Sequence, residues 1–282
     1  MTPFRDGAID EKAYQGFIDW QIKQGTHGLV PCGTTGESPT LNHAEHMRVV
    51  ELCVEAAQGR VPIIAGSGSN STEEAIQLTR HAKEAGADAA LVITPYYNKP
   101  SQEGLYQHYK AIQGSVDLPI IIYNIPGRCV VDMSIATMTR LSELPNIIGV
   151  KDATADLTRP FATRREIGDD FCQLSGEDAT VLEFLDEGGH GCISVSANVA
   201  PKLLSEMHTA WMKGDRTTAR EIHERLMPVH DAMFVDTNPC PVKYAACLQG
   251  HFSGDLRLPL VEISKENKKR VRQALETADL LV

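Results

Sequence analysis

Short apolar runs and amphipathic segments alternate along the chain as far as residue 195. The apolar runs are rich in β-branched residues and lack regular polar positions, which is typical of parallel strands that are covered on both faces. The amphipathic segments carry apolar residues at the spacing of a helix. This order predicts repeated strand–helix units around a parallel sheet.

The pattern predicts strands at residues 28–32, 61–65, 89–94, 119–123, 147–151, 171–174 and 191–195. Helices are expected between and before them, at residues 11–24, 44–57, 72–85, 102–113 and 179–187. Asn42 and Ser71 stand just before two of these helices and are good N-terminal caps. Beyond residue 200 the pattern is helical, at about residues 201–213, 217–229, 241–248 and 265–280.

An eight-stranded barrel needs one more strand than these runs supply. Residues 1–4 resemble the end of a strand, so we expect an abbreviated first strand. The predicted fold is α/β, a (β/α)8 TIM barrel over residues 1–213 with a C-terminal helical extension over residues 214–282. A doubly wound open sheet also fits the pattern, but no GxGxxG follows the first strand to support nucleotide binding.

Length and composition agree with a barrel enzyme. The chain has 282 residues, and α/β barrels typically need about 250. A net charge of −10 argues against a nucleic-acid surface. No apolar run approaches the roughly 20 residues of a membrane span, and no signal peptide precedes the fold. The 7 cysteines form no CxxC and suit reduced thiols, so we expect a cytoplasmic enzyme.

Lys151 ends the apolar run at residues 147–151. In an α/β barrel, the end of a strand lies at the catalytic face. A lysine amine attacks a carbonyl only when it is neutral, and apolar surroundings lower the ordinary lysine pKa of about 10.4. Lys151 is therefore a candidate for Schiff-base formation with a ketone or aldehyde. A solvated lysine at the start of a loop is the simpler alternative for this residue considered alone.

Polar residues also follow the other predicted strands, and in a barrel they would meet at one mouth. A tyrosine hydroxyl there can relay protons, and an arginine can pair with a carboxylate through two hydrogen bonds. Glycines let backbone amides approach a small anion, such as the carboxylate of an α-keto acid. The set predicts an imine-forming aldolase for a keto acid. It comprises Gly33, Thr34, Thr35, Gly36, Glu37, Tyr96, Tyr97, Asn98, Tyr123, Asn124, Arg128, Lys151, Asp152, Ser175, Gly176 and Glu177.

Four motifs resemble the dihydrodipicolinate synthase family of class I pyruvate aldolases, which also contains N-acetylneuraminate lyase and 2-keto-3-deoxy sugar acid aldolases. They are GTTGES at residues 33–38, TPYYNKPSQEGLYQHY at 94–109, YNIPGR at 123–128 and GVKDAT at 149–154. The similarity extends from Thr2 to the C-terminus. Thr35, Tyr97 and Arg128 favour the synthase branch over a lyase for a longer 2-keto acid, which stays an alternative.

The resemblance implies a homotetramer that condenses pyruvate with L-aspartate-4-semialdehyde in lysine and diaminopimelate biosynthesis. It implies neither a metal nor an organic cofactor. Lys151 would carry the pyruvate imine. Tyr123 would relay protons, with Thr34 between it and a Tyr97 that is supplied across a dimer interface. Arg128 would hold the semialdehyde carboxylate, and pyruvate would be bound by Thr35, Gly176 and Ile193.

The resemblance also implies a pocket for L-lysine as a feedback inhibitor at a dimer interface. A carboxylate can pair with the ε-ammonium of lysine, while histidine and backbone groups take its carboxylate. The matching positions are Ser38, Pro39, His43, His46, Gly68, Asn70, Glu74 and Tyr96. His43 and His46 could instead be two ligands of a metal, but no third ligand is evident, or they are ordinary surface residues on a helix.

Cys129 and Val130 follow Arg128 where many relatives of this family carry Thr-Gly. We therefore expect the loop that carries Arg128 to differ from theirs. An alternative from another functional class is a barrel that has lost catalysis and serves as a binding protein, in which Lys151 would form no adduct with pyruvate.

Overall fold

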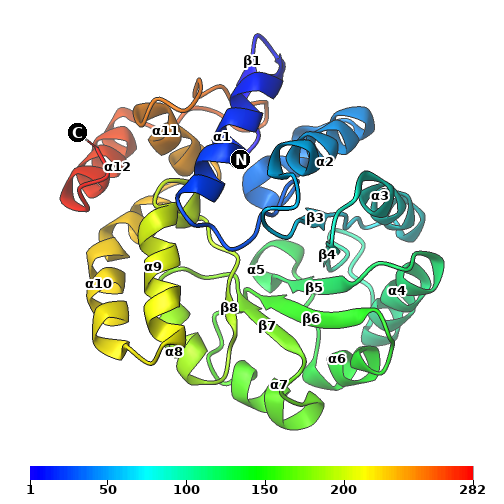
Figure 1. Cartoon of the computed structure of the whole chain (residues 1–282). Coiled ribbons are helices and arrows are strands. Elements are labelled where there is room, and N and C mark those ends of the chain that lie inside the picture. The colour runs from blue at the N-terminus through cyan, green and yellow to red at the C-terminus, as the bar shows by residue number, and fades with distance from the viewer. Residues whose placement is uncertain (282) are drawn as a thin grey trace. The chain divides into compact units, whose positions relative to one another are not determined.

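The computed structural model describes residues 1–281, and the chain divides into two compact units (Figure 1). The first, Ile63–Ile193, is called the sheet unit here. The second combines Met1–Pro62 with the chain from Ser194 onward and is called the terminal unit.

Within the described residues, the sheet unit contains a parallel six-stranded sheet in the order β3-β4-β5-β6-β7-β8. Its strands are β3 (Ile64–Gly66), β4 (Ala89–Ile93), β5 (Ile120–Asn124), β6 (Ile147–Asp152), β7 (Cys172–Ser175) and β8 (Gly191–Cys192). The intervening helices are α3 (Thr72–Ala85), α4 (Gln102–Ser115), α5 (Pro126–Cys129), α6 (Ile135–Ser142), α7 (Arg159–Ile167) and α8 (Val181–Asp186). Each strand pairs with the next along the chain, as a TIM-barrel-like fold requires.

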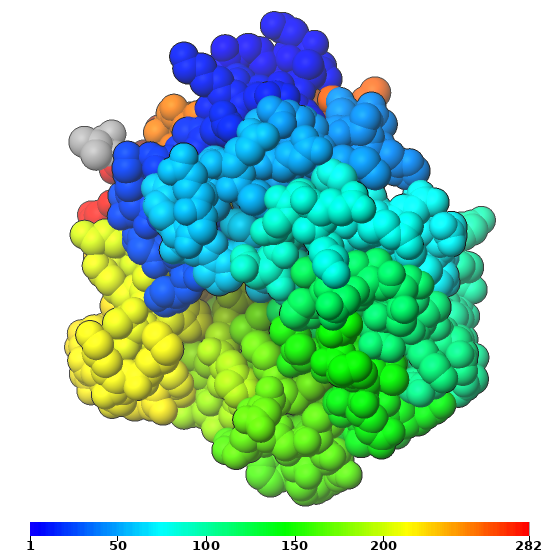
Figure 2. Space-filling view, turned by 45° about the vertical axis from the view of Figure 1, so that its right-hand side comes forward, coloured from blue at the N-terminus to red at the C-terminus, as the bar shows by residue number. Residues whose placement is uncertain are grey.

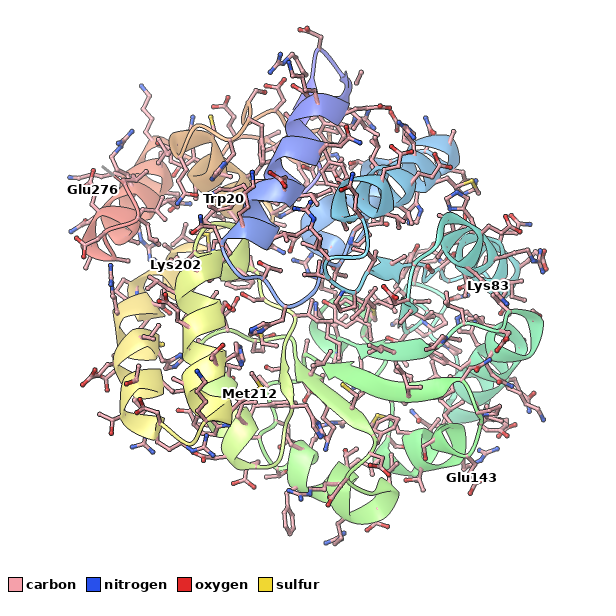
Figure 3. The ribbon with its side chains drawn as sticks, viewed as in Figure 1. Trp20, Lys83, Glu143, Lys202, Met212 and Glu276 are labelled. Carbon is pink, nitrogen blue, oxygen red and sulfur yellow. The ribbon has the colours of Figure 1, made fainter. Side chains whose placement is uncertain are left out.

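The helices α3, α4 and α6 follow one another along the outside of this sheet (Figure 1). Their side chains form the adjoining cyan and green surfaces in Figure 2. Lys83 near the end of α3 and Glu143 just after α6 are exposed and point outward (Figure 3). The apolar side chains of β4 and β5 are buried between the helices and the sheet interior, as the absence of polar alternation predicted.

Close approach of neighbouring strands depends on glycine in β6. A Cβ atom at Gly149 would lie 2.3 Å from the carbonyl oxygen of Cys172 on β7. No other residue fits there without moving one of the two strands. Gly149 therefore helps to place Lys151, two residues further along β6.

Three helices of the sheet unit were missed by the sequence pattern: α5, α6 and α7. Each is short, and α6 and α7 consist of only 8 and 9 residues. Ser134 accepts a hydrogen bond from the Thr137 amide and caps α6, a signal that the sequence did contain. The other predicted helices in this unit agree with the structure to within about two residues at each end, the usual uncertainty of helix boundaries.

The terminal unit is mainly helical. Its helices are α1 (Glu11–Lys23), α2 (His43–Ala57), α9 (Pro201–Met212), α10 (Arg216–Ala232), α11 (Cys240–Leu248) and α12 (Lys265–Thr277), with the short 3-10 turns η1 (Thr34–Gly36), η2 (Ser38–Thr40) and η3 (Ser196–Asn198). Asn42 and Glu45 form a reciprocal capping box at the start of α2. On α1 lies Trp20, which is labelled in Figure 3. Its ring packs against that of His251, with the ring centres 4.0 Å apart.

The strand predicted at residues 28–32 was wrong. Of these residues only Leu29 makes a bridge, and its amide donates to the Pro62 carbonyl at 3.0 Å. Pro31 has no amide hydrogen to donate, and Cys32 has a left-handed φ of 55°. Phe4, predicted to end an abbreviated strand, belongs to β1 (Phe4–Arg5), which pairs antiparallel with β2 (Ala8–Ile9).

A buried ion pair connects distant parts of the terminal unit. Lys243 on α11 bonds to Glu37, and both side chains are only 1% exposed. The Lys243 amine also lies 4.1 Å from the centre of the Phe4 ring. Burial lowers the pKa of Lys243, although the charge of Glu37 opposes that shift. Glu37 has a left-handed φ of 56°, so the pair holds a tight turn in place.

Among residues 1–281, no helix is both long enough and apolar enough to cross a membrane.

Candidate active site

Lys151 lies near the end of β6 and is 9% exposed. Its amine is 4.1 Å from the centre of the Tyr123 ring, which belongs to β5. The two residues are register partners on adjacent parallel strands. The side chain predicted to form a Schiff base is therefore buried against an aromatic ring, and the residue is not a solvated lysine at a loop start.

Gly176, directly after β7, lies next to the Lys151 side chain. A Cβ atom at Gly176 would be 3.2 Å from Lys151 Cε and 2.7 Å from the Cβ of Ala153. Its amide donates to the Asp152 carbonyl at 2.7 Å, and the Ile193 amide donates to the Ser175 carbonyl at 2.9 Å. The absence of a side chain at Gly176 thus leaves room for the Lys151 side chain, and the amides of Gly176 and Ile193 are already bonded within the protein.

Two further titratable groups interact with this lysine: Glu177, which belongs to the predicted strand-end set, and Cys192, which was not predicted to lie at the site. Burial raises the pKa of Glu177, while the charges of Lys151 and Arg128 oppose the shift. Burial also raises the pKa of the Cys192 thiol, which keeps the thiol protonated beside the amine. The position of Cys192 at the end of β8 was the signal that could have identified it.

Arg128 lies on α5 and is exposed. Cys129 after it is buried, and Val130 ends the helix with a left-handed φ of 66°. A β-branched residue rarely adopts this conformation, whereas glycine does so without strain. The left-handed backbone at Val130 thus lies where the sequence is expected to differ from its relatives. That this loop differs from theirs stays a prediction.

A buried polar network lies one residue beyond Lys151 and Tyr123. Asp152 and Asn124 belong to the predicted strand-end set, but their bonds to Arg159 and Asp132 were not predicted. Asp152 follows the lysine and bonds to the guanidinium of Arg159, with 3.0 Å between Oδ2 and Nε. Asn124 follows the tyrosine, and its side-chain amide donates to Asp132 at 2.8 Å. Arg159 also bonds to Asp132, with 3.3 Å between Nη1 and Oδ2. The sequence signal for this network was a polar residue at each of two buried strand ends, Asn124 and Asp152, followed by the basic Arg159 at a helix start.

Tyr97 is strongly exposed, with 89% of its surface accessible. It has a left-handed φ of 70°, and the neighbouring Tyr96 is 40% exposed. An exposed tyrosine held on a strained turn is suited to contact another molecule. The assignment of Tyr97 to the catalytic centre of a neighbouring copy stays a prediction.

Half of the residues predicted to bind lysine lie in the sheet unit. The Ser69 hydroxyl donates to Glu74, and the Asn98 side-chain amide donates to the Asn70 carbonyl at 2.9 Å. Burial and the charge of Glu74 raise the pKa of Tyr96. The structure therefore brings Asn70, Glu74 and Tyr96 together, while Gly68 packs closely against β4.

The remaining predicted residues belong to the terminal unit. Thr34 and Thr35 lie in η1 and are half-buried, and the Asn238 side-chain amide donates to the Thr35 hydroxyl at 3.0 Å. The terminal-unit positions predicted for the lysine pocket lie on η2 and α2: Ser38, Pro39, an exposed His43 and a buried His46.

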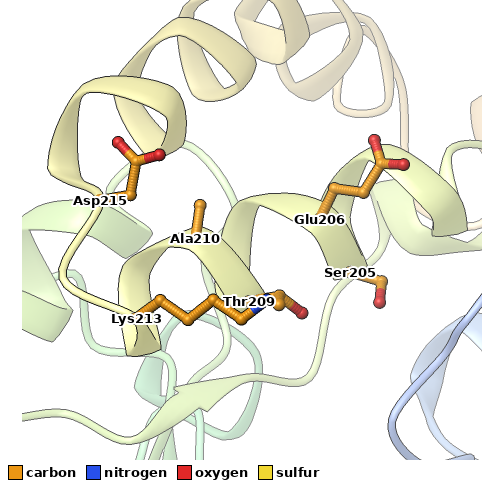
Figure 4. A pocket seen from close by; sticks show the side chains of 6 residues that line it. All are labelled: Ser205, Glu206, Thr209, Ala210, Lys213 and Asp215. Atoms are coloured by element: carbon orange, nitrogen blue, oxygen red, sulfur yellow. The ribbon is translucent and has the colours of Figure 1, made fainter.

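Other features carry no assigned chemistry. No group of three histidine, cysteine, aspartate or glutamate side chains within residues 1–281 is arranged to hold a metal ion. A groove of about 270 Å³ lies along the second half of α9 and is lined by Ser205, Glu206, Thr209, Ala210, Lys213 and Asp215 (Figure 4). None of these residues was predicted to bind a ligand.

Residues 1–278 match the model of the "Dihydrodipicolinate synthetase family". A protein of Rhodospirillum centenum named 4-hydroxy-tetrahydrodipicolinate synthase is 66% identical over 281 residues, covering 100% of this chain and 97% of the relative. The crystal structure of dihydrodipicolinate synthase from Aquifex aeolicus is 45% identical, with a TM-score of 0.98 over 100% of this chain and 97% of that one. This similarity confirms the predicted α/β barrel fold class.

Two similar structures contain small molecules. The chloride-inhibited dihydrodipicolinate synthase of Acinetobacter baumannii, complexed with pyruvate, is 45% identical with a TM-score of 0.97 over 100% of this chain and 97% of that one. The DHDPS of Cyanidioschyzon merolae with lysine bound is 37% identical with a TM-score of 0.96 over 100% of this chain and 96% of that one.

Proposed function

The chain belongs to the dihydrodipicolinate synthetase family, and we propose that it condenses pyruvate with L-aspartate-4-semialdehyde to form 4-hydroxy-tetrahydrodipicolinate. The enzyme class predicted from the sequence, a Schiff-base-forming lyase, is confirmed by these comparisons. The observation that carries the proposed chemistry is the burial of the Lys151 amine against the Tyr123 ring at the end of β6.

The Lys151 amine attacks C2 of pyruvate, and loss of water leaves an imine between the lysine and the keto acid. Removal of a proton from the pyruvate methyl group then gives an enamine. Its terminal carbon attacks the aldehyde carbon of the second substrate and forms the new carbon–carbon bond. The amino group of that substrate replaces the lysine at C2, which closes the ring and releases the enzyme. The Tyr123 hydroxyl is the proposed proton donor and acceptor in these transfers.

The second substrate carries a carboxylate, and Arg128 is the proposed partner for it. An exposed guanidinium on a short helix can reach a ligand and bind a carboxylate through two hydrogen bonds. We assign Gly176 to the space around pyruvate because it adjoins Lys151, and Ile193 because its amide bonds to Ser175, the residue before Gly176. The roles of Thr34 and Thr35 rest on the resemblance, as does the homotetramer in which Tyr97 serves a neighbouring copy.

Borohydride reduction in the presence of pyruvate tests the proposal directly. We expect the intact mass to increase by one reduced pyruvate adduct, and peptide mapping to place it on Lys151. Condensation is then measured with L-aspartate-4-semialdehyde, alongside cleavage of N-acetylneuraminate and a 2-keto-3-deoxy sugar acid. An adduct accompanied by cleavage of the longer acids alone would identify a lyase. Absence of any adduct would contradict imine chemistry altogether.

L-Lysine is the proposed feedback inhibitor. Support comes from the similar structure with lysine bound and from the cluster of Asn70, Glu74 and Tyr96. Glu74→Gln should raise the lysine concentration needed for half-inhibition about tenfold or more, because a charge-assisted hydrogen bond contributes about 1.5–3 kcal/mol. Glu73→Gln on the exposed side of the same helix is the matched control. Full activity of the parent enzyme at saturating lysine would disprove the regulation.

The proposed location is the cytoplasm. All 7 cysteines are free thiols, which is typical of proteins in a reducing compartment. Fractionation of the native host, followed by detection of the chain and its activity in the soluble cytoplasmic fraction, tests this assignment.

A further inference from the structure

Arg159 is a buried cation at the start of α7, with only 10% of its side chain exposed. All three of its guanidinium nitrogens are bonded. Nε donates to Asp152 at 3.0 Å, Nη1 to Asp132 at 3.3 Å and Nη2 to the Met133 carbonyl at 2.7 Å. A planar fork of donors suits this arrangement, whereas the compact ammonium of a lysine cannot span it.

The partners of this guanidinium are the immediate neighbours of the reacting residues. Asp152 follows Lys151 on β6, and Asn124 follows Tyr123 on β5. Asn124 and Asp152 are themselves register partners, one step beyond the lysine–tyrosine pair. The Asn124 side chain donates to Asp132 at 2.8 Å and accepts from the Met133 amide at 3.0 Å. One guanidinium thus connects the ends of both strands.

The same bonds hold the far end of the loop that carries Arg128. This loop leaves β5 after Asn124, and the bonds to Asp132 and Met133 return it to the strand end. Successive side chains of a strand point to opposite faces, so Asp152 and Lys151 face opposite sides of β6. The Thr154 amide and hydroxyl donate hydrogen bonds to the other carboxylate oxygen of Asp152, Oδ1, at 2.9 and 2.6 Å. Bonds within the protein thus involve all three guanidinium nitrogens of Arg159 and both carboxylate oxygens of Asp152.

We propose that Arg159 is a positioning residue, whose guanidinium sets the relative placement of Lys151, Tyr123 and the Arg128 loop. This inference rests on the proposed function, because it assigns a role in that reaction. Arg159 acts through Asp152, Asp132 and Asn124 without touching the substrate. Its effect is on geometry, and a misplacement of about 1 Å at a catalytic group costs about 100-fold in rate.

Arg159→Lys, which keeps the charge but loses the fork, tests the inference. We expect kcat for the folded enzyme to fall about 10- to 100-fold, with slower formation of the pyruvate adduct on Lys151. In Arg159→Ala, added guanidinium should restore part of kcat, and methylammonium at the same concentration should not. Arg164→Lys is the matched control, since Arg164 lies on the same helix and is half exposed.

Asp132→Asn keeps the test informative if the Arg159 variants do not fold, because the Asp132 side chain is 49% exposed and the substitution is isosteric. We expect a fall in kcat of about threefold or more. The inference is overturned if Arg159→Lys retains the parent kcat while the parent enzyme forms the adduct and condenses its substrates. Where Arg159→Lys does not fold, an unchanged kcat in Asp132→Asn overturns it. A loss of thermal stability alone, with kcat unchanged, overturns it too. A parent enzyme without adduct contradicts the proposed function itself.

Discussion

The Lys151 amine lies 4.1 Å from the centre of the Tyr123 ring, and the two residues are paired in register on adjacent parallel strands. Parallel pairing places both side chains at the same level and on the same side of the sheet. The amine is thereby held against the ring that carries the hydroxyl proposed to exchange protons with its adduct.

Lys151→Arg should abolish imine chemistry, because a guanidinium stays protonated and does not attack a carbonyl. We expect kcat to fall about 1,000-fold or more and the borohydride adduct with pyruvate to disappear. Intact-mass measurement after reduction gives the second readout. Lys83→Arg, at an exposed position of α3, serves as the control and should behave like the parent. An adduct of unchanged yield in Lys151→Arg would assign the imine to another lysine.

Tyr123→Phe retains the ring that packs against the lysine amine and removes only the hydroxyl. We expect kcat to fall about 100- to 10,000-fold, the range for loss of a general acid–base group. Pyruvate should still label Lys151 on reduction, although more slowly. Tyr106→Phe, on α4, is the control, and steady-state kinetics together with mass measurement provide the comparison. A kcat equal to that of the parent would remove Tyr123 from the proton transfers.

Gly176→Ala should misplace the reacting lysine. The added Cβ would lie 2.7 Å from the Cβ of Ala153 and 3.2 Å from Lys151 Cε, so atoms on both sides must move. We expect a loss of about 1–3 kcal/mol in stability and of about tenfold or more in kcat. Gly114→Ala on α4 meets nothing within 4 Å and is the control. Urea unfolding and steady-state kinetics measure the two effects, and an unaltered kcat would show that the lysine tolerates the methyl group.

Val130→Gly should stabilise the protein. Val130 has a left-handed φ of 66° and is 67% exposed, so glycine relieves backbone strain and gives up little buried surface. Strain of about 1–3 kcal/mol is partly offset by the greater freedom of glycine in the unfolded chain, about 0.5–1 kcal/mol. We expect a net gain of up to about 2 kcal/mol in the free energy of unfolding. Val131→Gly, which removes a buried side chain, should change the urea midpoint in the opposite direction.

The stability of the sheet unit should decrease in mild acid because of His108. This residue is buried on α4, its Nδ1 bonds to the Thr72 hydroxyl at 2.9 Å, and burial lowers its pKa from 6.5 to about 4. As the pH falls, the unfolded chain therefore binds the proton before the folded chain does. The contribution of neutral His108 is fully present above about pH 6.5 and is lost towards pH 4, by up to about 3 kcal/mol.

Replacement of this histidine by a group that does not titrate checks that account. His108→Gln should reduce the difference between the urea midpoints at pH 7 and pH 5, because the unfolded chain loses its extra proton uptake. His81→Gln, at a half-buried position of α3, is the control and should retain the parent difference. An equal pH dependence in His108→Gln and the parent would assign the acid sensitivity to other groups.

Local signals in the sequence were enough for much of the fold. Helix α3 has the predicted bounds because Ser71 supplies a cap and apolar residues recur at helical spacing. The buried strands β4, β5 and β6 were recognisable because both faces of a parallel strand are apolar. By contrast, residues 28–32 looked like a strand, yet the left-handed φ at Cys32 ends it. An apolar run shows that residues are buried, but it does not show with which residues they pair.

The candidate site, too, was predictable from the sequence in part, and the rest depended on the tertiary structure. The sequence by itself determined the kind of chemistry, since a lysine at the end of an apolar run and the motifs around it are local features of the chain. The tertiary structure decided that the lysine packs against Tyr123 and adjoins Gly176, and that Arg159 connects Asp152 to Asp132. These contacts join residues on different strands, helices and loops, and their distances depend on the register and twist of the sheet. No local pattern of residues fixes those quantities, because they result from the packing of the folded chain as a whole.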